Sequence, residues 1–345
     1  MSVDVKSRVR AALPASAFQK SPMRLVLGLG ALATNSLLIV AAAKLIGGKF
    51  LLGLPAVLFV AVVGVLVGHL NAIMSFVSHE ILHNAVISGR RRQDLFAFVL
   101  FSPFQMSPTF WRYWHNFLHH KHTQNSIRDP DAYPRYAHYK SSRVYQRLYS
   151  LAPGSGTLMS YFYLFYWFSF QTIWNQSVRR FREQHWRKLN HKRVSLEFGV
   201  QLVLMGGFVV AVWLYLGWLG IFGLVVVPFL IQNYLLMSYI ATNHNLSPQT
   251  RENNPLENSM SVKSHVVFEF LHGNFGYHVE HHLFPSMNPW SLNLVHDVLS
   301  REKGYRCMEK WRAMRLLYVT PRIYKDRETL IDPKSRREVP LADLH

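Results

Sequence analysis

Long apolar runs constrain this chain more than any other feature. One run extends from Leu25 to Ile46 and a second from Leu51 to Val77, with the short link GGKF close to the point where they meet. Each exceeds the roughly 18 residues that are typical of a membrane span. The first is also too long, and wrongly flanked, for a cleaved signal peptide. The two runs therefore predict a tight helical hairpin across a membrane.

Two further apolar runs lie in the second half of the chain. They cover Phe198–Leu219 and Ile221–Ile240, and Gly220 is the expected joint of a second hairpin. The stretch 157–174 is also long enough to span, but nine of its residues are Phe, Tyr or Trp, a composition typical of a membrane interface. We expect it to lie in the interface, with a fifth span as the alternative.

Basic residues predict how these spans are oriented. Residues 179–193 carry seven Lys or Arg, the first 24 residues carry five, and 89–92 add three. Such segments stay in the cytoplasm, and all of them share one side if the chain crosses four times. We expect an all-α integral membrane protein with four transmembrane helices in two hairpins, both termini in the cytoplasm, and a cytoplasmic helical cap that holds a di-metal site.

The expected domain organisation follows from these spans. Residues 1–24 form a cytoplasmic N-terminal segment, 25–290 a membrane domain, and 291–345 the C-terminal tail of the cap. The net charge of +19 would suit nucleic acid, but long apolar runs do not suit a soluble nucleic-acid-binding domain. Anionic lipid headgroups explain the charge more simply, so we expect a membrane and no nucleic acid. The single cysteine, Cys307, excludes an intrachain disulfide.

Histidines form three clusters, and their spacing points to metal ligands. The clusters are SHEILHN, WHNFLHHKHT and HVEHH, and His244 stands apart at the end of the fourth run. Helical residues three or four apart share a face, so His79 pairs with His83 and His115 with His119, while His120 is rotated by about 100°. His278, His281 and His282 form an i, i+3, i+4 set. Neutral imidazole is a good ligand for iron and zinc.

The first cluster also fits the H-E-x-x-H pattern of zinc peptidases, with Glu80 as the base. A catalytic zinc needs about three protein ligands, which would leave most of the clustered histidines unused. Eight or nine nitrogen ligands fit two metal ions better. A metal transporter would instead place polar ligands in the middle of the membrane, whereas these clusters lie at one edge.

With these motifs in view, the chain resembles the membrane fatty acid desaturases, within the integral-membrane histidine-box di-iron oxidases. SHEILHN is similar to the first histidine box, WHNFLHHKHT to the second and GNFGYHVEHHLFPSMNP to the third, and DPDAY at 129–133 is similar to a family element. The resemblance runs from about residue 50 to 290. It implies nine iron ligands, namely His79, His83, His115, His119, His120, His244, His278, His281 and His282.

Six further residues are expected to support those ligands. The candidates are Glu80, His122, Asn243, Asn245, Asp129 and Asp131, with Asn243 or Asn245 as a holder of a metal-bound water. Some relatives carry an Asn four residues before the isolated histidine, but this chain has Ile240 there.

The resemblance implies an O₂-dependent desaturase that introduces a cis double bond into an acyl chain at two iron ions. The alternative is a related di-iron hydroxylase or monooxygenase acting on a sphingolipid, carotenoid or alkane. The acyl carrier is expected to be coenzyme A, an acyl carrier protein or a lipid. The chain lacks an HPGG haem motif, so electrons must come from a separate ferredoxin or cytochrome b5 type donor. A basic face with Lys310, Arg312, Arg315 and Arg322 would suit such an acidic partner, with lipid headgroups and solvation as the alternative explanation of these charges.

Overall fold

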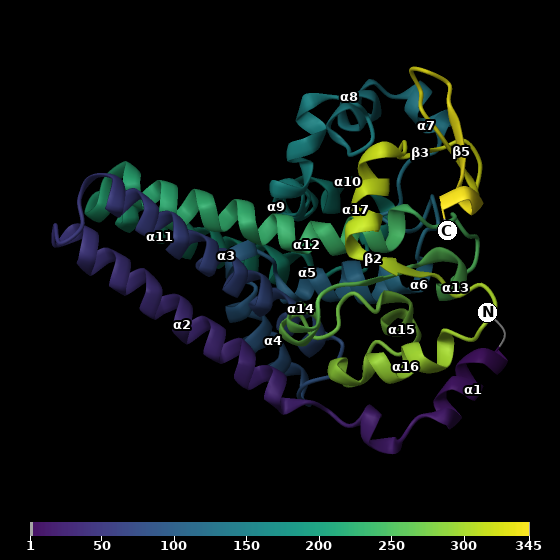
Figure 1. Ribbon diagram of the computed structural model, residues 1–345, viewed down its shortest axis with the longest axis horizontal. Coiled ribbons are helices and arrows are strands. Elements are labelled where there is room, and N and C mark those ends of the chain that lie inside the picture. The colour runs from purple at the N-terminus through teal and green to yellow at the C-terminus, as the bar shows by residue number, and fades with distance from the viewer. Residues whose placement is uncertain (1–2, 345) are drawn as a thin grey trace. The chain divides into compact units, whose positions relative to one another are not determined.

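The computed structural model of the chain describes residues 3–344. These residues form two compact units, each built from segments that are distant in the sequence. Unit 1 comprises residues 3–20, 113–163 and 238–344, and unit 2 comprises residues 21–112 and 164–237. Helices dominate both units (Figure 1).

Unit 2 is built from helices alone in the described chain. The long helices α2 and α3 pack side by side (Figure 1). The α-helices are α2 (Pro22–Gly47), α3 (Gly53–Leu82), α4 (Arg90–Leu100), α5 (Pro108–Trp111), α9 (Trp167–Trp174), α10 (Arg180–Arg182), α11 (His191–Ile221) and the first part of α12 (Val227–Asn245). The shorter elements are the 3-10 helices η2 (Ser102–Phe104) and η6 (Gln184–Trp186) and the π-helices η5 (Asn175–Arg179) and η7 (Phe222–Val226).

Three helices within residues 3–344 are long and apolar enough to cross a membrane. They are Pro22–Gly47, Gly53–Leu82 and the 55-residue segment His191–Asn245. The first two contain the first two apolar runs, and the third contains both later runs. The membrane character predicted from the sequence is therefore supported. Helix α3 continues past the end of its apolar run to Leu82, which carries His79 into its last turn.

The chain turns back on itself inside His191–Asn245. Gly217 has φ 61° and ψ −148°, which is not helical and which residues other than glycine rarely adopt. A Cβ at Gly220 would lie 3.0 Å from the side chain of Val212, eight residues earlier. Eight residues of straight helix span about 12 Å, so the segment folds back. The turn is at Gly217, and the expected joint at Gly220 is wrong because Gly220 is helical and packs against the preceding helix.

The aromatic stretch 157–174 does not form one long helix. It divides into the 3-10 helix η4 (Leu158–Phe165) and the α-helix α9, with Tyr166 between them at φ −142°. An eight-residue α-helix is about 12 Å long, well short of the roughly 30 Å of a bilayer core. This agrees with the expectation that the stretch is not a fifth span.

Polar side chains and close glycine contacts join the long helices of unit 2. Asn35 donates to Asn71 at 2.8 Å, and Asn71 donates to Gln232 at 2.7 Å. A Cβ at Gly68 of α3 would lie 2.7 Å from Ile231 Cβ, so α3 and α12 approach closely. Small residues and interhelical amides are the usual means by which membrane helices associate, because lipid gives no hydrophobic drive for it.

Unit 1 combines short helices with short strands. Its helices are α1 (Val3–Ala12), η1 (Ala15–Phe18), η3 (Arg112–His119), α6 (His120–His122), α7 (Tyr136–Ser141), α8 (Arg143–Leu151), most of η4, the end of α12, α13 (Pro255–Asn258), α14 (Val266–Leu271), α15 (His278–Leu283), η8 (Pro289–Ser291), α16 (Leu292–Leu299), α17 (Lys310–Val319) and η9 (Leu341–Leu344). The strands are β1 (Ser261–Lys263), β2 (Cys307–Glu309), β3 (Ile323–Tyr324), β4 (Thr329–Ile331) and β5 (Glu338–Pro340).

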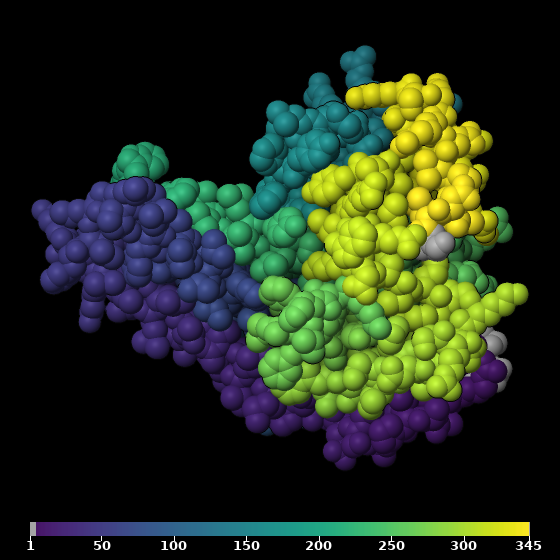
Figure 2. Space-filling model, viewed as in Figure 1, coloured from purple at the N-terminus to yellow at the C-terminus, as the bar shows by residue number. Residues whose placement is uncertain are grey.

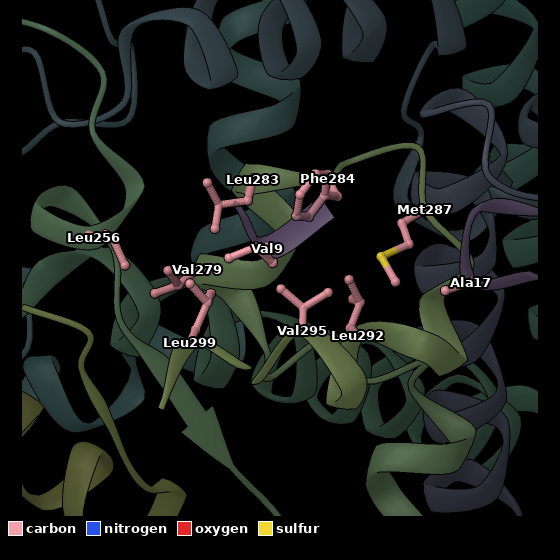
Figure 3. Packing of buried hydrophobic residues seen from close by; sticks show 10 residues of the cluster. All are labelled: Val9, Ala17, Leu256, Val279, Leu283, Phe284, Met287, Leu292, Val295 and Leu299. Carbon is pink, nitrogen blue, oxygen red and sulfur yellow. The ribbon is translucent and has the colours of Figure 1, made fainter. Parts of the chain in front are cut away.

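One hydrophobic cluster of unit 1 packs against the helix that carries the third histidine cluster. Apolar residues of α15 and α16 meet residues from the N-terminal segment (Figure 3). The N-terminal segment contributes Val9 and Ala17, and α15 contributes Val279 and Leu283, which lie four residues apart on one side of that helix. Burial of this apolar face fixes which way the histidines on the other face of α15 point.

The expectation of an all-α protein is wrong for the C-terminal part of unit 1. Strand β1 pairs in parallel with β2, and β3, β4 and β5 form an antiparallel sheet. The link between β4 and β5 is a tight turn in which Asp332 accepts from the Lys334 N–H at 2.8 Å and Arg336 has φ 63°. Asp favours such turns through its side chain. Each strand has only two or three residues, too few for a period-two pattern to stand out.

Candidate metal centre

Four histidines from three segments of unit 1 point their ring nitrogens at one another. They are His119, His244, His278 and His282, and all are buried. The Nε2 atom of His244 lies 3.2 Å from that of His119 and 2.7 Å from that of His278, and the Nε2 atoms of His278 and His282 are 3.1 Å apart. We call these residues the four-histidine group.

The opposite ring nitrogens of this group show which tautomer is present. His119 Nδ1 lies 3.2 Å from both carboxylate oxygens of Asp129, and His244 Nδ1 lies 3.4 Å from the Asn258 carbonyl. His282 Nδ1 lies 3.3 Å from the Thr123 hydroxyl, which itself donates to the His119 carbonyl at 2.9 Å. Each Nδ1 therefore carries the proton and donates it, so the Nε2 lone pairs of these three histidines point to one place. Such convergence is unfavourable unless a cation lies between them.

The distances and charges fit a transition metal. A metal–imidazole bond of about 2.1 Å places neighbouring ligand nitrogens about 3.0–3.4 Å apart, close to the observed separations. Burial lowers the pKa of His278 and His282 well below the usual imidazole range. Burial also acts to lower the pKa of His119, but Asp129 outweighs it, so that pKa is raised. Neutral imidazole is the form that binds metal.

A second group in unit 1 consists of His115, His120 and His281. The Nε2 atom of His120 lies 3.1 Å from that of His115 and 3.2 Å from that of His281. Burial lowers the pKa of His281 to about 3, so it too is neutral near pH 7. We call these residues the three-histidine group.

The rings of His115 and His119 lie together as expected, stacked at 5.1 Å, but their ring nitrogens join different groups. The segment Arg112–His119 is a π-helix, in which residues five apart rather than four apart share a face. His115 therefore faces His120, while His119 joins the four-histidine group. The set in α15 divides in the same way, because His278 and His282 go to the four-histidine group and His281 to the three-histidine group.

His79 and His83 lie in unit 2, at the end of α3. Their rings meet edge to face at 4.6 Å, and both rings contact Trp111 at 5.2 and 5.3 Å. Arg112 donates to the Leu82 carbonyl at 2.8 Å. The end of this helix is thus covered by an aromatic ring and neutralised by a cation, which suits its carbonyls and its dipole.

Glu80 is bound by an arginine. Arg24 Nε and Nη2 donate to its two carboxylate oxygens, each at 2.7 Å, and both side chains are buried. A bidentate pair of this kind holds the carboxylate firmly. A general base of a zinc peptidase needs a carboxylate that can reach a metal-bound water, and this carboxylate is already fully engaged with a cation.

The other supporting candidates have different surroundings. Asp131 accepts from Trp114 Nε1 at 3.1 Å and lies 3.6 Å from His119 Nδ1. His122 belongs to neither histidine group, and burial and nearby cations lower its pKa. Asn243 is fully buried, and neither atom of its amide has a hydrogen-bond partner among the described residues. The carbonyl of Asn245 accepts from Arg322 at 2.9 Å.

Gln124 is not among the residues predicted from the sequence, yet it contacts both Asp129 and the backbone of the ligand His244. Its backbone N–H donates to Asp129 at 2.8 Å, and its side chain donates to the His244 carbonyl at 2.6 Å. Gln124 is buried and has φ 58°, a conformation that non-glycine residues hold mainly where the surroundings enforce it. The only local signal is the polar run TQNS after the second cluster, which predicts a turn but not its contacts.

Arg322 and Tyr324 also support the end of α12. Arg322 donates to the Asn245, Leu317 and Thr320 carbonyls, and Tyr324 donates to the Ser247 carbonyl at 2.6 Å. Arg322 is only 1% exposed, so its expected place on a basic surface is wrong. Its burial follows from the carbonyls at two helix ends that need donors.

Comparison with known proteins agrees with the geometry. Residues 55–312 match the model of a family described as fatty acid desaturase. The match contains all three histidine clusters and His244, while Arg24, Arg322 and Tyr324 lie outside it. A search of curated proteins found no match.

Proposed function

The chain belongs to the fatty acid desaturase family, and we propose that it introduces a cis double bond into a fatty acyl chain with O₂ as co-substrate. The observation that carries the proposal is the four-histidine group, in which four buried ring nitrogens converge on one point and three of the rings are held by a hydrogen-bond partner at Nδ1. A protein has few other reasons to bury four histidines in this way, because each buried ring nitrogen needs a partner. Membership of the family supports an oxidoreductase.

We propose two iron ions as the cofactor. The four-histidine group would hold one ion, and His115, His120 and His281 would hold the second together with His79 and His83, as the resemblance of the first histidine box implies. Two irons so bound would supply the dioxygen chemistry that removal of hydrogen from an unactivated methylene requires. The set of nitrogen ligands differs from the carboxylate-rich di-iron sites of soluble bundles.

The protein residues then perform positioning work. Asp129, Asn258 and Thr123 hold the Nδ1 protons of His119, His244 and His282, which keeps the metal-facing nitrogens unprotonated and the rings fixed. Trp111 covers His79 and His83 and excludes water from them. Exclusion of water protects reactive species and strengthens electrostatic interactions inside the site.

The remaining parts of the proposal follow from the sequence. We propose four membrane crossings, with the site and both termini in the cytoplasm. Coenzyme A, an acyl carrier protein or a lipid would carry the acyl chain, and a ferredoxin or a cytochrome b5 type protein would supply electrons.

Lipid analysis of cells that express the protein tests the reaction. We expect a new alkene in the extracted fatty acids, abolished by His278→Ala and by His244→Ala and retained by His138→Ala, a matched change at an exposed histidine outside the clusters. A hydroxylated product without an alkene would establish the related hydroxylase instead. Purified protein should hold two irons per chain, and a single zinc ion would contradict the proposal.

A further inference from the structure

Helix α14 has its apolar side turned outward. Val266, Val267, Phe268 and Phe270 are between 42% and 72% exposed, whereas Glu269 is buried at 7%. A surface helix in water has the opposite arrangement, with its apolar side chains on the core. Adjacent exposed apolar residues of this kind mark a surface that contacts another molecule or a membrane.

Helix α17 has a related surface that mixes aromatic, apolar and basic residues. Trp311 is 68% exposed and Val319 is 52% exposed, and the exposed Arg312 and Arg315 lie between them in sequence. Figure 2 shows α14 in green and α17 in yellow-green exposed on one face of unit 1. Trp and Arg in this combination are typical of the region where lipid headgroups meet acyl chains.

Contacts within unit 1 join these helices to a third exposed segment, the start of η4. The Lys310 ammonium lies 3.0 Å from the ring centroid of Tyr239, and the Tyr239 hydroxyl is 3.1 Å from Nδ1 of His272 at the end of α14. At the other end of α17, Tyr318 stacks on Tyr161 of η4 at 5.5 Å. The segment around Tyr161 exposes four large apolar residues, namely Leu158, Met159, Tyr161 and Phe162.

The position of Tyr239 relates this surface to the membrane. Tyr239 belongs to α12, the last part of a candidate membrane span, and lies about 9 Å along the axis from Asn245 at 1.5 Å per residue. Tyrosines near the end of a span lie at the level of the lipid headgroups. Helix α14 packs on this tyrosine, so its exposed apolar residues are close to the depth at which lipid begins.

We propose that α14, the exposed face of α17 and residues 158–162 form one lipid-binding surface that rests on a bilayer rich in anionic lipids. We call it the lipid belt. The aromatic and apolar residues would enter the interface, and Arg312 and Arg315 would bind lipid phosphates. A second copy of the chain fits less well, because a symmetric contact would bring these arginines close to one another.

Site-directed fluorescence tests the lipid belt without any reference to catalysis. Cys307→Ser removes the single cysteine, and Val266→Cys, Trp311→Cys and Leu158→Cys then each carry an environment-sensitive dye. Ser335→Cys, in the exposed turn between β4 and β5, is the matched control. Full-length protein is placed in nanodiscs of phosphatidylcholine with phosphatidylserine, one copy per disc, so that only lipid can shield the dye.

We expect blue-shifted emission and strong quenching by spin-labelled lipid at the three belt positions, and neither effect at the control. Arg312→Gln with Arg315→Gln should reduce the quenching, and discs without phosphatidylserine should do the same. Water-like emission at the belt positions in discs that retain folded, iron-containing protein would overturn the inference. Iron content is measured in the same samples, so failure of the lipid belt and failure of the proposed function are separable.

Discussion

Two helix ends carry histidines, and they are held by different kinds of contact. The end of α3 in unit 2 is held by charge, through the buried pair of Arg24 and Glu80 and through Arg112. The end of α12 in unit 1 is held by neutral side chains, chiefly Gln124 and Tyr324, which donate to backbone carbonyls. Arg322 also donates to carbonyls there, and the hydrogen bonds described for it include none to a carboxylate.

The difference matters because the loss of one partner has a different energetic cost for each kind of contact. Removing one member of a buried ion pair leaves an unpaired charge inside the protein, which is costly. Removing a neutral donor leaves one carbonyl with fewer partners, which costs less. The end of α3 should therefore depend strongly on a single residue, whereas the end of α12 should tolerate most single changes.

Glu80→Gln tests the charged end and should have the largest effect. We expect a loss of about 3–5 kcal/mol of stability, because Arg24 stays buried without its counter-charge. Thermal unfolding of the purified protein measures it. The control is Glu338→Gln, which breaks the half-exposed pair with Lys325 and should change stability by about 0–1 kcal/mol.

Arg24→Met combined with Glu80→Gln should recover most of that loss, because no charge then remains buried. A zinc peptidase predicts a different outcome, since Glu80→Gln would then abolish activity and leave stability intact. Equal stability of wild type and Glu80→Gln would refute the charged anchor at the end of α3.

Gln124→Glu tests the end of α12 at the residue that donates to both the His244 and the Ser247 carbonyls. The substitution keeps the shape of the side chain but replaces the donor amide with a carboxylate that faces the carbonyls of His244 and Ser247. Changes to groups that orient metal ligands typically cost about 10–100-fold in metal affinity or activity, and we expect a loss in that range. Iron content and alkene yield are the measurements.

The same substitution at an exposed glutamine shows whether the loss of iron is caused by the position of Gln124 or by the added negative charge. Gln146→Glu also replaces an amide that donates to a carbonyl, that of Tyr139, but on the surface of α8. We expect normal iron content there. Equal iron loss in both variants, or in neither, would show that Gln124 does not position His244.

The sequence predicts features that depend on neighbouring residues better than features that depend on packing between distant segments. The apolar runs predict membrane helices because hydropathy is a local property, and the His79–His83 spacing lies on a regular helix. The grouping of His115 with His120 was missed because nothing in WHNFLHHKHT distinguishes a π-helix from an α-helix. The turn at Gly217 was placed three residues late because several glycines lie nearby and packing selects among them.

Contacts between distant segments were the least predictable. Arg24 and Glu80 are 56 residues apart, and Gln124 and Tyr324 are 200 apart. A single sequence contains no signal for such pairs. Arg322 illustrates the resulting error, since an arginine near the C-terminus is normally exposed, and only the carbonyls at two helix ends explain its burial.

Tyr324→Phe tests one neutral contact at the end of α12. The hydroxyl donates to the Ser247 carbonyl, which also accepts from Gln124, so the carbonyl keeps a partner. We expect a loss of about 0.5–1.5 kcal/mol with nearly full iron content, measured by thermal unfolding and metal analysis. Tyr145→Phe, at an exposed tyrosine of α8, should have no effect. A loss as large as that of Glu80→Gln would erase the contrast between the two helix ends.

Lys310 should make stability depend on pH near the α12 end. Burial lowers the pKa of Lys310 to about 7, although Glu269 acts to raise it. Above pH 7 the folded protein loses this proton while the unfolded chain, with a pKa near 10.4, still keeps it. The unfolded state then binds more protons, so stability rises with pH between about 7 and 9.

Lys310→Met should flatten this rise, because the group that titrates is gone. Thermal unfolding of the wild type and the variant across that pH range measures the slope, and Lys334→Met, at an exposed lysine, should keep the wild-type slope. If Lys310→Met leaves the slope unchanged, no titrating charge acts on Tyr239. The α12 end would then be held by neutral donors and Arg322 alone, in contrast to the α3 end, which is held by the buried ion pair of Arg24 and Glu80.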